Sequence, residues 1–288
     1  MKVGLSTYSL SRAIRANEMD VLQAIEWIAA NGGKHVEISP SGFTLTDNPS
    51  LVSAMVKKAK DCGLDISSYT IGANFVQGGK AERDAEVQRL KKEVDIAGAL
   101  GVKRMRHDVA YRKPEESTPE QFEKDLPPVT EACREIADYA AQYGITTSVE
   151  NHGYHFQHSE RILRLVKAVG RDNFRTTVDL GNFVCVDEDP LRAVTNNAPF
   201  ASMAHVKDFY LRDKELNPGE GFFRSSGGNY IRGAIVGQGD LDIRGCLKAL
   251  KKAGYDGYLS IEFEGMEDCR TGSKIGMENV VRLWNEIA

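Results

Sequence analysis

The chain has few of the residues that mark disulfide-rich, metal-ribbon or redox proteins. Its 288 residues include only five cysteines, at positions 62, 133, 185, 246 and 269, and no two of them form a CxxC pair. Zinc ribbons and thioredoxin-type motifs are therefore excluded. Scattered cysteines in a chain of this size are typical of reduced residues, so we expect a cytoplasmic protein.

Long apolar runs and an excess of basic residues are also missing. No eighteen apolar residues follow one another, so we expect no membrane span. The residues after Met1 resemble a strand and not a signal peptide, so we expect none. Lys and Arg total 37 against 41 Asp and Glu, a formal net charge of −4. This balance argues against a partner bound by phosphate neutralisation, and we expect no nucleic acid.

What the chain does contain is an alternation of short apolar runs with longer helical patterns, repeated about eight times. The predicted strands are 2–6, 35–39, 64–71, 102–107, 145–150, 174–179, 202–207 and 258–263. The predicted helices are about 18–31, 49–62, 81–100, 119–143, 159–169, 190–197, 243–253 and 275–287. Eight such units predict a single (β/α)8 TIM barrel over residues 1–288, with its active site at the C-terminal face of the strands. An open doubly wound sheet is less favoured because no GxGxxG follows the first strand.

Glycine supports this organisation at the junctions between helices and strands. Several predicted helices end in a glycine that is followed at once by a strand, as at Gly101 and Gly144, and glycine there supplies the left-handed cap. A second group of glycines lies in residues 209–242, which we expect to be an irregular loop after the seventh strand. A loop of that length is more often functional than idle, and its glycine-rich part, residues 217–239, is our candidate for substrate closure and specificity.

Four side chains able to bind a metal stand at the ends of the last four predicted strands. They are Glu150, Asp179, His205 and Glu262. Taken singly, each is more often a solvated, capping or structural residue. Together they meet at one face of a barrel, where carboxylates would repel one another unless a cation lay between them. The set predicts a site for one divalent ion, and the imidazole favours Mn²⁺ over Mg²⁺, with Co²⁺ and Zn²⁺ as alternatives.

Five short strings lie at or just after predicted strands. They are SVENH (148–152), TVDLGN (177–182), AHVKD (204–208), VGQGD (236–240) and SIEFE (260–264). Together they resemble the sugar phosphate isomerase/epimerase family of the xylose-isomerase-like TIM barrel superfamily, over essentially the whole chain. The resemblance implies that the four residues above are the metal ligands. It also implies that Glu150 and Glu262 form the catalytic acid/base pair, as in ketose epimerases.

The chemistry expected of such a site is isomerisation or epimerisation of a sugar or sugar-like substrate. A metal that chelates a carbonyl and its neighbouring hydroxyl acidifies the adjacent C–H by stabilising an enediolate. One carboxylate takes that proton, and its return to the opposite face or to the next carbon decides the product. The alternative is a metal-dependent lyase on the same fold, similar to inosose dehydratases or to subunits that cleave oxidised glycosides. A non-catalytic sugar-binding paralogue is a third hypothesis.

Further residues near the strand ends are candidates for contacts with a sugar or polyol. His107 and Glu37 end predicted strands four and two, and each could bind a hydroxyl or serve the structure. His152, in the loop after Glu150, could add a polar contact or carry a proton. Asn182 stands where apurinic endonucleases of the superfamily have a histidine ligand, which argues against that activity; it could bind a hydroxyl instead.

Three more candidates follow the seventh strand. Lys207 and Asp208 could orient His205 or bind substrate, against the alternative of a surface ion pair. Arg224 in the glycine-rich segment could hold a substrate phosphate, as could Arg232, although solvated loop arginines are common. The sequence leaves open whether the protein forms a homo-oligomer or joins a partner subunit.

Overall fold

Eight short parallel strands form the centre of the structure, which is a computed structural model describing residues 1–287. They are β1 (Lys2–Ser6), β2 (His35–Ile38), β3 (Asp65–Ile71), β4 (Arg104–His107), β5 (Thr146–Glu150), β6 (Phe174–Asp179), β7 (Ala201–Val206) and β11 (Tyr258–Ile261). The strands pair in chain order, and β1 pairs with both β2 and β11, so the sheet is closed. The predicted barrel and all eight of its strands are confirmed.

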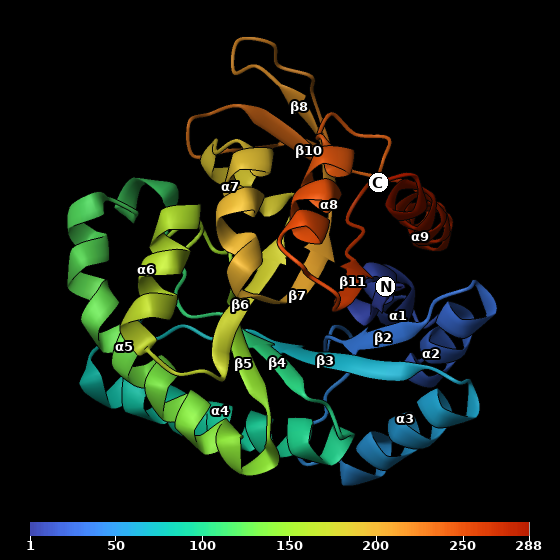
Figure 1. Ribbon diagram of the computed structural model, residues 1–288, viewed down its shortest axis with the longest axis horizontal. Coiled ribbons are helices and arrows are strands. Elements are labelled where there is room, and N and C mark those ends of the chain that lie inside the picture. Colours follow the sequence, from blue (N-terminus) through green and yellow to red (C-terminus); the bar gives the residue numbers. More distant parts are fainter. Residues whose placement is uncertain (288) are drawn as a thin grey trace.

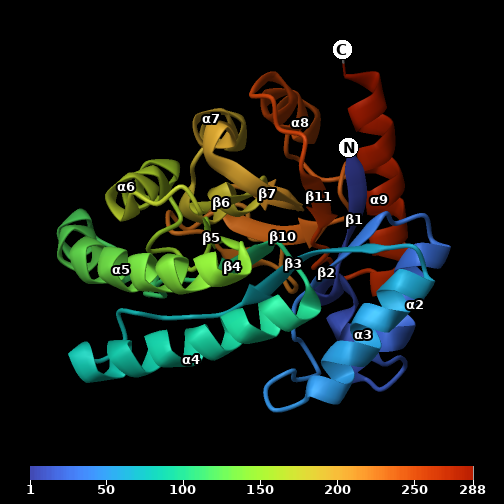
Figure 2. The same cartoon turned by 60° about the horizontal axis from the view of Figure 1, so that its bottom comes forward.

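Helices surround the barrel in chain order, as Figures 1 and 2 show. They are α2 (Val21–Ala30), α3 (Pro49–Asp61), α4 (Lys80–Leu100), α5 (Pro119–Ala140), α6 (Ser159–Val169), α7 (Pro190–Asn197), α8 (Ile243–Lys252) and α9 (Cys269–Glu286). Helix α9 begins six residues before its predicted start, because Asp268 caps it by accepting from the backbone N–H of Thr271. Among the described residues, no helix is long and apolar enough to cross a membrane.

The predicted glycine caps are present. Gly101 has φ 73° and Gly144 has φ 62°, both in the left-handed region that residues with a side chain seldom adopt. The backbone N–H of Gly101 bonds to the carbonyl of Ala97, one of the last in α4. Each cap turns the chain into the next strand within a few residues, which is what places eight strand ends at one face.

Two parts of the chain contain structure that the sequence patterns did not predict. Between β1 and α2 lie a short 3-10 helix, η1 (Thr7–Leu10), and α1 (Ser11–Arg15). The segment expected to be an irregular loop forms a three-stranded antiparallel sheet of β8 (Asp208–Arg212), β10 (Tyr230–Ala234) and β9 (Phe223–Arg224). We call this small sheet, residues 208–234, the flap.

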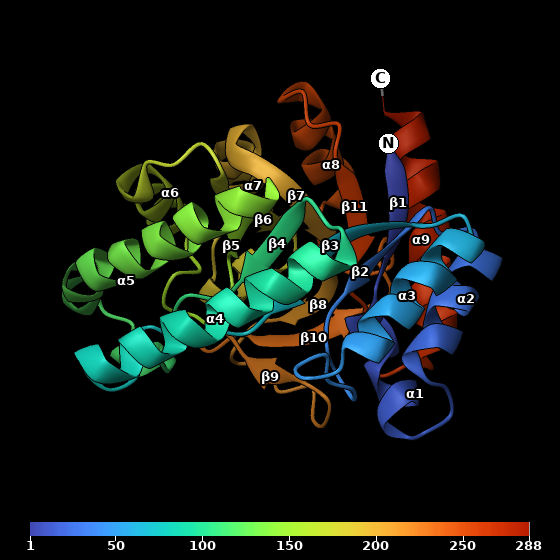
Figure 3. The same ribbon diagram turned by 90° about the horizontal axis from the view of Figure 1, so that it is seen from below.

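The flap lies at the end of the barrel where the strands finish, opposite the two chain termini (Figure 3). Its inner face is apolar: Phe209 and Ile231 are buried against Val184 and Cys185 of the 3-10 helix η4 (Asn182–Val186). Strand β10 is only five residues long, contains Gly233, and has four buried residues and no exposed one, so it lacks the alternation typical of a half-buried strand. That brevity explains why the periodicity was too weak to predict a strand.

Strand alternation decides which side chains face the inside of the barrel. In β5, Ser148 and Glu150 point inward, and the hydroxyl of Ser148 lies 2.8 Å from that of Thr177 on β6. Val149 between them points outward and is fully buried in the core against the helices. A residue at the end of a strand therefore reaches the barrel mouth only if it falls on the inward face.

Candidate active site

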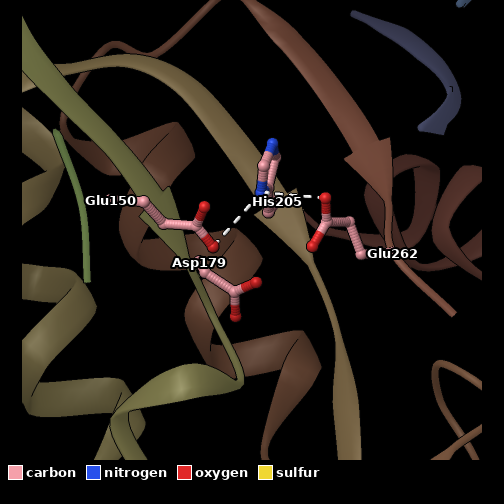
Figure 4. Close-up of side chains that lie close together, drawn as sticks. All are labelled: Glu150, Asp179, His205 and Glu262. Carbon is pink, nitrogen blue, oxygen red and sulfur yellow. Dashed lines mark ion pairs between the residues drawn. The ribbon is translucent and has the colours of Figure 1, made fainter. Parts of the chain in front are cut away.

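The predicted metal ligands lie together at the barrel mouth. Glu150, Asp179, His205 and Glu262 each offer an atom within 4.8 Å of those of the other three, and all four are buried. Figure 4 shows the His205 ring between Glu150 and Glu262, with Asp179 below. Four neighbouring strands deliver them, β5, β6, β7 and the end of β11, because the barrel register sets these strand ends side by side.

The ring of His205 is held by Glu37, a residue of β2. His205 Nε2 donates to Glu37 Oε1 at 3.0 Å, and Thr70 Oγ1 donates to the same oxygen at 2.7 Å. Burial opposes the charge on Glu37, but His205 and these hydrogen bonds lower the pKa of Glu37 to about 2. The pairing leaves His205 Nδ1 facing the cluster, 3.4 Å from Glu150 and 3.5 Å from Glu262.

The two carboxylate oxygens of Asp179 have different surroundings. Its Oδ1 accepts from the backbone N–H of Gly181 at 2.7 Å and of Asn182 at 2.8 Å. Its Oδ2 is buried and has no hydrogen-bond partner in the part of the chain that the structure describes. Burial raises the pKa of Asp179 to about 6, against the effect of the nearby Lys207 ammonium.

Glu150 is held by an arginine and an asparagine. Arg106 Nε lies 2.6 Å from its Oε2, and Asn182 Nδ2 donates to its Oε1 at 2.9 Å. Burial acts to raise the pKa of Glu150, but Arg106 and His205 outweigh it and hold that pKa well below its usual value. Arg106 also contacts Asp108 at 2.7 Å, so it links the cluster to the loop after β4.

A buried lysine completes the cluster. Lys207 Nζ lies 3.3 Å from Glu262, 3.6 Å from Asp179 and 3.6 Å from Glu264. Despite burial, these carboxylates hold the pKa of Lys207 well above its usual value. The acids of the cluster still outnumber its permanent cations, Arg106 and Lys207.

The donor set fits a divalent cation. Asp179 Oδ2 and His205 Nδ1 are buried atoms without hydrogen-bond partners among residues 1–287, and both face the oxygens of Glu150 and Glu262. A buried polar atom without a partner is costly unless something binds it. Three carboxylates and one imidazole suit Mn²⁺, Co²⁺ or Zn²⁺, and Mg²⁺ less well. The carboxylate of Glu37 behind His205 supplies the outer support usual for a histidine ligand.

A cavity of about 320 Å³ opens above these residues. Its lining joins Glu150, Glu262 and Lys207 to two residues that the sequence reasoning missed, Tyr8 and Glu264, whose side chains are 3.2 Å apart. His152, predicted to contact substrate, is at the rim, where its Nδ1 lies 3.1 Å from Asp108. Tyr8 belongs to η1, a 3-10 helix that the sequence patterns did not predict. Its position just after the first predicted strand is the one feature that could have indicated it.

The structure leaves several predicted contacts outside the cavity. His107 faces the helices, near Phe75 and Phe174, because Arg106 occupies the inward position at the end of β4. Glu37 is fully buried behind His205 and does not line the cavity. These two side chains act on the structure around the site.

The remaining two lie in the flap. Asp208 accepts from the backbone N–H groups of Phe209, Gly237 and Gly239 at 2.8–3.0 Å, so its carboxylate fixes the base of the flap. Arg224 donates to the carbonyl of Gly228 at 2.6 Å and stacks on Tyr230, away from the cavity.

Sequence comparisons agree with this architecture. Residues 25–282 match the model of a family described as the xylose isomerase-like TIM barrel. The rhizopine catabolism protein MocC of Rhizobium meliloti is 23% identical over 236 residues, 76% of this chain and 71% of that protein. The L-ribulose-5-phosphate 3-epimerase UlaE of Salmonella paratyphi A is 23% identical over 217 residues, 73% and 68% of the two chains.

Solved structures with the same fold include a protein named IOLI with a bound zinc atom. It shares 16% identity, with a TM-score of 0.77 over 100% of this chain and 99% of that one. The probable 3-DHS dehydratase AsbF of Bacillus anthracis shares 14% identity, with a TM-score of 0.76 over 98% and 99%. At these identities the likeness concerns the fold.

Proposed function

We propose that this chain, which belongs to the xylose isomerase-like TIM barrel family, is a metal-dependent isomerase or epimerase of a sugar or sugar-like substrate. The observation that carries the proposal is the convergence of Glu150, Asp179, His205 and Glu262 within 4.8 Å of one another beneath an open cavity. The epimerase UlaE among the sequence relatives supports the same reaction class. We propose Mn²⁺ as the ion, with Mg²⁺, Co²⁺ and Zn²⁺ as alternatives.

These four residues would hold the ion. When bound, it would polarise a substrate carbonyl and its neighbouring hydroxyl, so that the adjacent C–H becomes more acidic. Glu150 and Glu262 lie on opposite sides of His205 (Figure 4), and each carboxylate also borders the cavity. This placement suits one of them to remove the proton and the other to return it on the far face.

The neighbours of each glutamate set its protonation state. Arg106 and His205 lower the pKa of Glu150 and keep it ionised near neutral pH, as a general base requires, and Asn182 donates a hydrogen bond to it. Lys207 lies 3.3 Å from Glu262 and 3.6 Å from Glu264, and its ammonium can donate to a substrate oxygen where charge develops. Arg106 and Lys207 are positioning and electrostatic residues in this account, and the two glutamates carry the proton.

A lyase is the second candidate, and His152 is the observation that favours it. Its half-exposed ring lies at the cavity rim, and burial of the ring is outweighed by Asp108, which raises the pKa of His152. A protonated imidazole there could assist a leaving group after the same proton abstraction. The complete ligand set argues against a non-catalytic sugar-binding paralogue.

Hydrogen exchange separates these reactions. The protein is incubated with Mn²⁺ in D₂O with a panel of ketoses, polyols and their oxidised forms. Isomerases and epimerases introduce deuterium into an intact carbon skeleton, whereas a lyase releases water or an aglycone. We expect Glu150→Gln to abolish the exchange, with Glu123→Gln, an exposed surface variant, as the control. Exchange that persists unchanged in Glu150→Gln would overturn the assignment of the base.

A further inference from the structure

A second cavity, of about 370 Å³, adjoins the first beneath the flap. Three residues, His152, Lys207 and Glu264, line both cavities. The rest of its lining comes from the loops after β4 and β5, from η4, and from the flap and its neighbour Met266. The two cavities together leave room for a substrate to reach from the metal ligands towards the flap.

The flap contributes one arginine to this cavity, Arg232 on β10. Its guanidinium lies over the ring of Tyr210, 4.7 Å from the centroid, and 5.3 Å from that of Phe222. Tyr210 is its direct cross-strand partner in β8. Stacking on aromatic faces leaves the N–H edge of a guanidinium available for a ligand.

That edge has almost no partner within the protein. Among residues 1–287, no carboxylate lies within ion-pair distance of Arg232, and its Nε is buried without a hydrogen-bond partner. Within the described residues, the one hydrogen-bond acceptor near its Nη1 is the sulfur of Met266, at 3.8 Å. Arg224 in the same sheet differs, since both of its terminal nitrogens are bound, to Gly228 and to Tyr230.

The position of Arg232 is fixed by the backbone around it. A Cβ at Gly233 would lie 2.7 Å from the backbone of Glu264, so the flap packs directly on the chain after β11. Asp208 binds backbone N–H groups at the base of the flap, and Asp187 binds Ser225 and Asn229 at its tip, at 2.6 and 2.8 Å. A cation held this firmly can select a substrate group at a defined distance from the reacting carbon.

We propose that Arg232 binds an anionic group, a phosphate or a carboxylate, at the end of the substrate remote from the reacting carbonyl. The proposal rests on the proposed function, because it assigns the substrate of the same site. The planar guanidinium suits either oxyanion through paired N–H donors. Lys207 adds positive charge to the same cavity, and Glu264, the one acid in its lining, is already paired with Lys207.

The test compares three versions of one ketose in the D₂O exchange assay: neutral, phosphorylated at the far end, and oxidised there to a carboxylate. We expect the wild type to prefer an anionic form, and the preferred form identifies the anion. Arg232→Gln should lower kcat/KM for that form roughly 10- to 100-fold and leave the neutral ketose unchanged. Arg232→Lys should recover part of the loss, and the control Arg224→Gln should change nothing. A wild type that prefers the neutral ketose, or a preference that survives Arg232→Gln, would overturn the proposal.

A binding measurement keeps this test separate from the proposed function. The Mn²⁺-treated protein is titrated with inorganic phosphate and with glycolate by calorimetry. We expect one of these anions to bind the wild type and Arg224→Gln equally and to bind Arg232→Gln at least tenfold more weakly. If no ketose exchanges hydrogen but this pattern holds, the proposed reaction fails and the anion site stands. If all three proteins bind both anions equally, the anion site fails.

Discussion

His205 and His155 are both fully buried, and each places Nε2 close to a carboxylate, Glu37 at 2.9 Å and Asp125 at 2.8 Å. In both rings Nδ1 lacks a hydrogen-bond partner among the residues described. The surroundings of that second nitrogen differ. For His205 they are the carboxylates of the candidate metal site, whereas the ring of His155 packs against Phe156, 5.3 Å between centroids.

The pKa values of the two histidines follow these surroundings. Burial acts against the charged form of each ring. For His155 it prevails and lowers the pKa, although Asp125 opposes it. For His205 the carboxylates around the ring outweigh burial and hold its pKa well above the usual value. A buried histidine–carboxylate pair therefore fixes the orientation of the imidazole ring. Whether the histidine can bind an ion depends on what its other nitrogen faces.

The largest expected effect is on catalysis at the His205 cluster. Replacing Glu262 by Gln keeps its shape but removes the charge that accepts a proton. The exchange rate in D₂O should fall about 10²- to 10⁴-fold, the range for loss of a general acid or base. Asp125→Asn, the matching change beside His155, should leave the rate of the folded enzyme unchanged. Equal losses in the two variants would contradict the comparison.

A smaller effect, on metal affinity, is expected for Glu37, which lies behind the metal-binding candidates. Glu37→Gln removes the charged acceptor that orients His205, so the affinity for Mn²⁺ should fall about 10- to 100-fold. The comparison variant is again Asp125→Asn, which should bind Mn²⁺ as the wild type does. Calorimetric titration of both proteins measures the two affinities. An unchanged affinity in Glu37→Gln would mean that the pairing with His205 does not support metal binding.

Strand β4 shows how much of the site could be predicted from the sequence. The end of that strand was correctly located, and His107 was expected to face the mouth. A shift of one residue reverses the face of a strand, so Arg106 is in the site and His107 is outside it. The four metal-binding candidates do lie together, as the pattern of strand ends predicted, because each falls on the inward face of its strand.

The parts missed from the sequence depend on contacts distant along the chain. Tyr8 meets Glu264 across 256 residues, and neither was identified as a site residue, although Glu264 directly follows a predicted strand. Arg224 and Arg232 were equally plausible anion binders in a glycine-rich segment. They became distinguishable only when the pairing of β8 and β10 placed one in a cavity and the other against a carbonyl.

The smallest expected effect is on stability, and it concerns His107, which lies outside the site. Burial lowers the pKa of His107 to about 4, from 6.5. The unfolded chain therefore takes up a proton below pH 6.5 that the folded chain refuses until about pH 4. The stability from His107 is complete above pH 6.5 and is lost as the pH falls towards 4. His107→Gln should reduce the slope of unfolding free energy against pH in this window by up to about 1.4 kcal/mol per pH unit. Urea unfolding at several pH values measures it, and an unchanged slope would show that His107 is not buried as a neutral ring.

The most direct test of the account is a Mn²⁺ titration followed by electron paramagnetic resonance of the wild type, His205→Ala and His155→Ala. We expect one tightly bound Mn²⁺ per chain in the wild type and in His155→Ala, and none in His205→Ala. Circular dichroism of each protein verifies that it is folded. Tight binding of one Mn²⁺ by folded His205→Ala, or its absence from the wild type, would contradict the assignment of the metal centre.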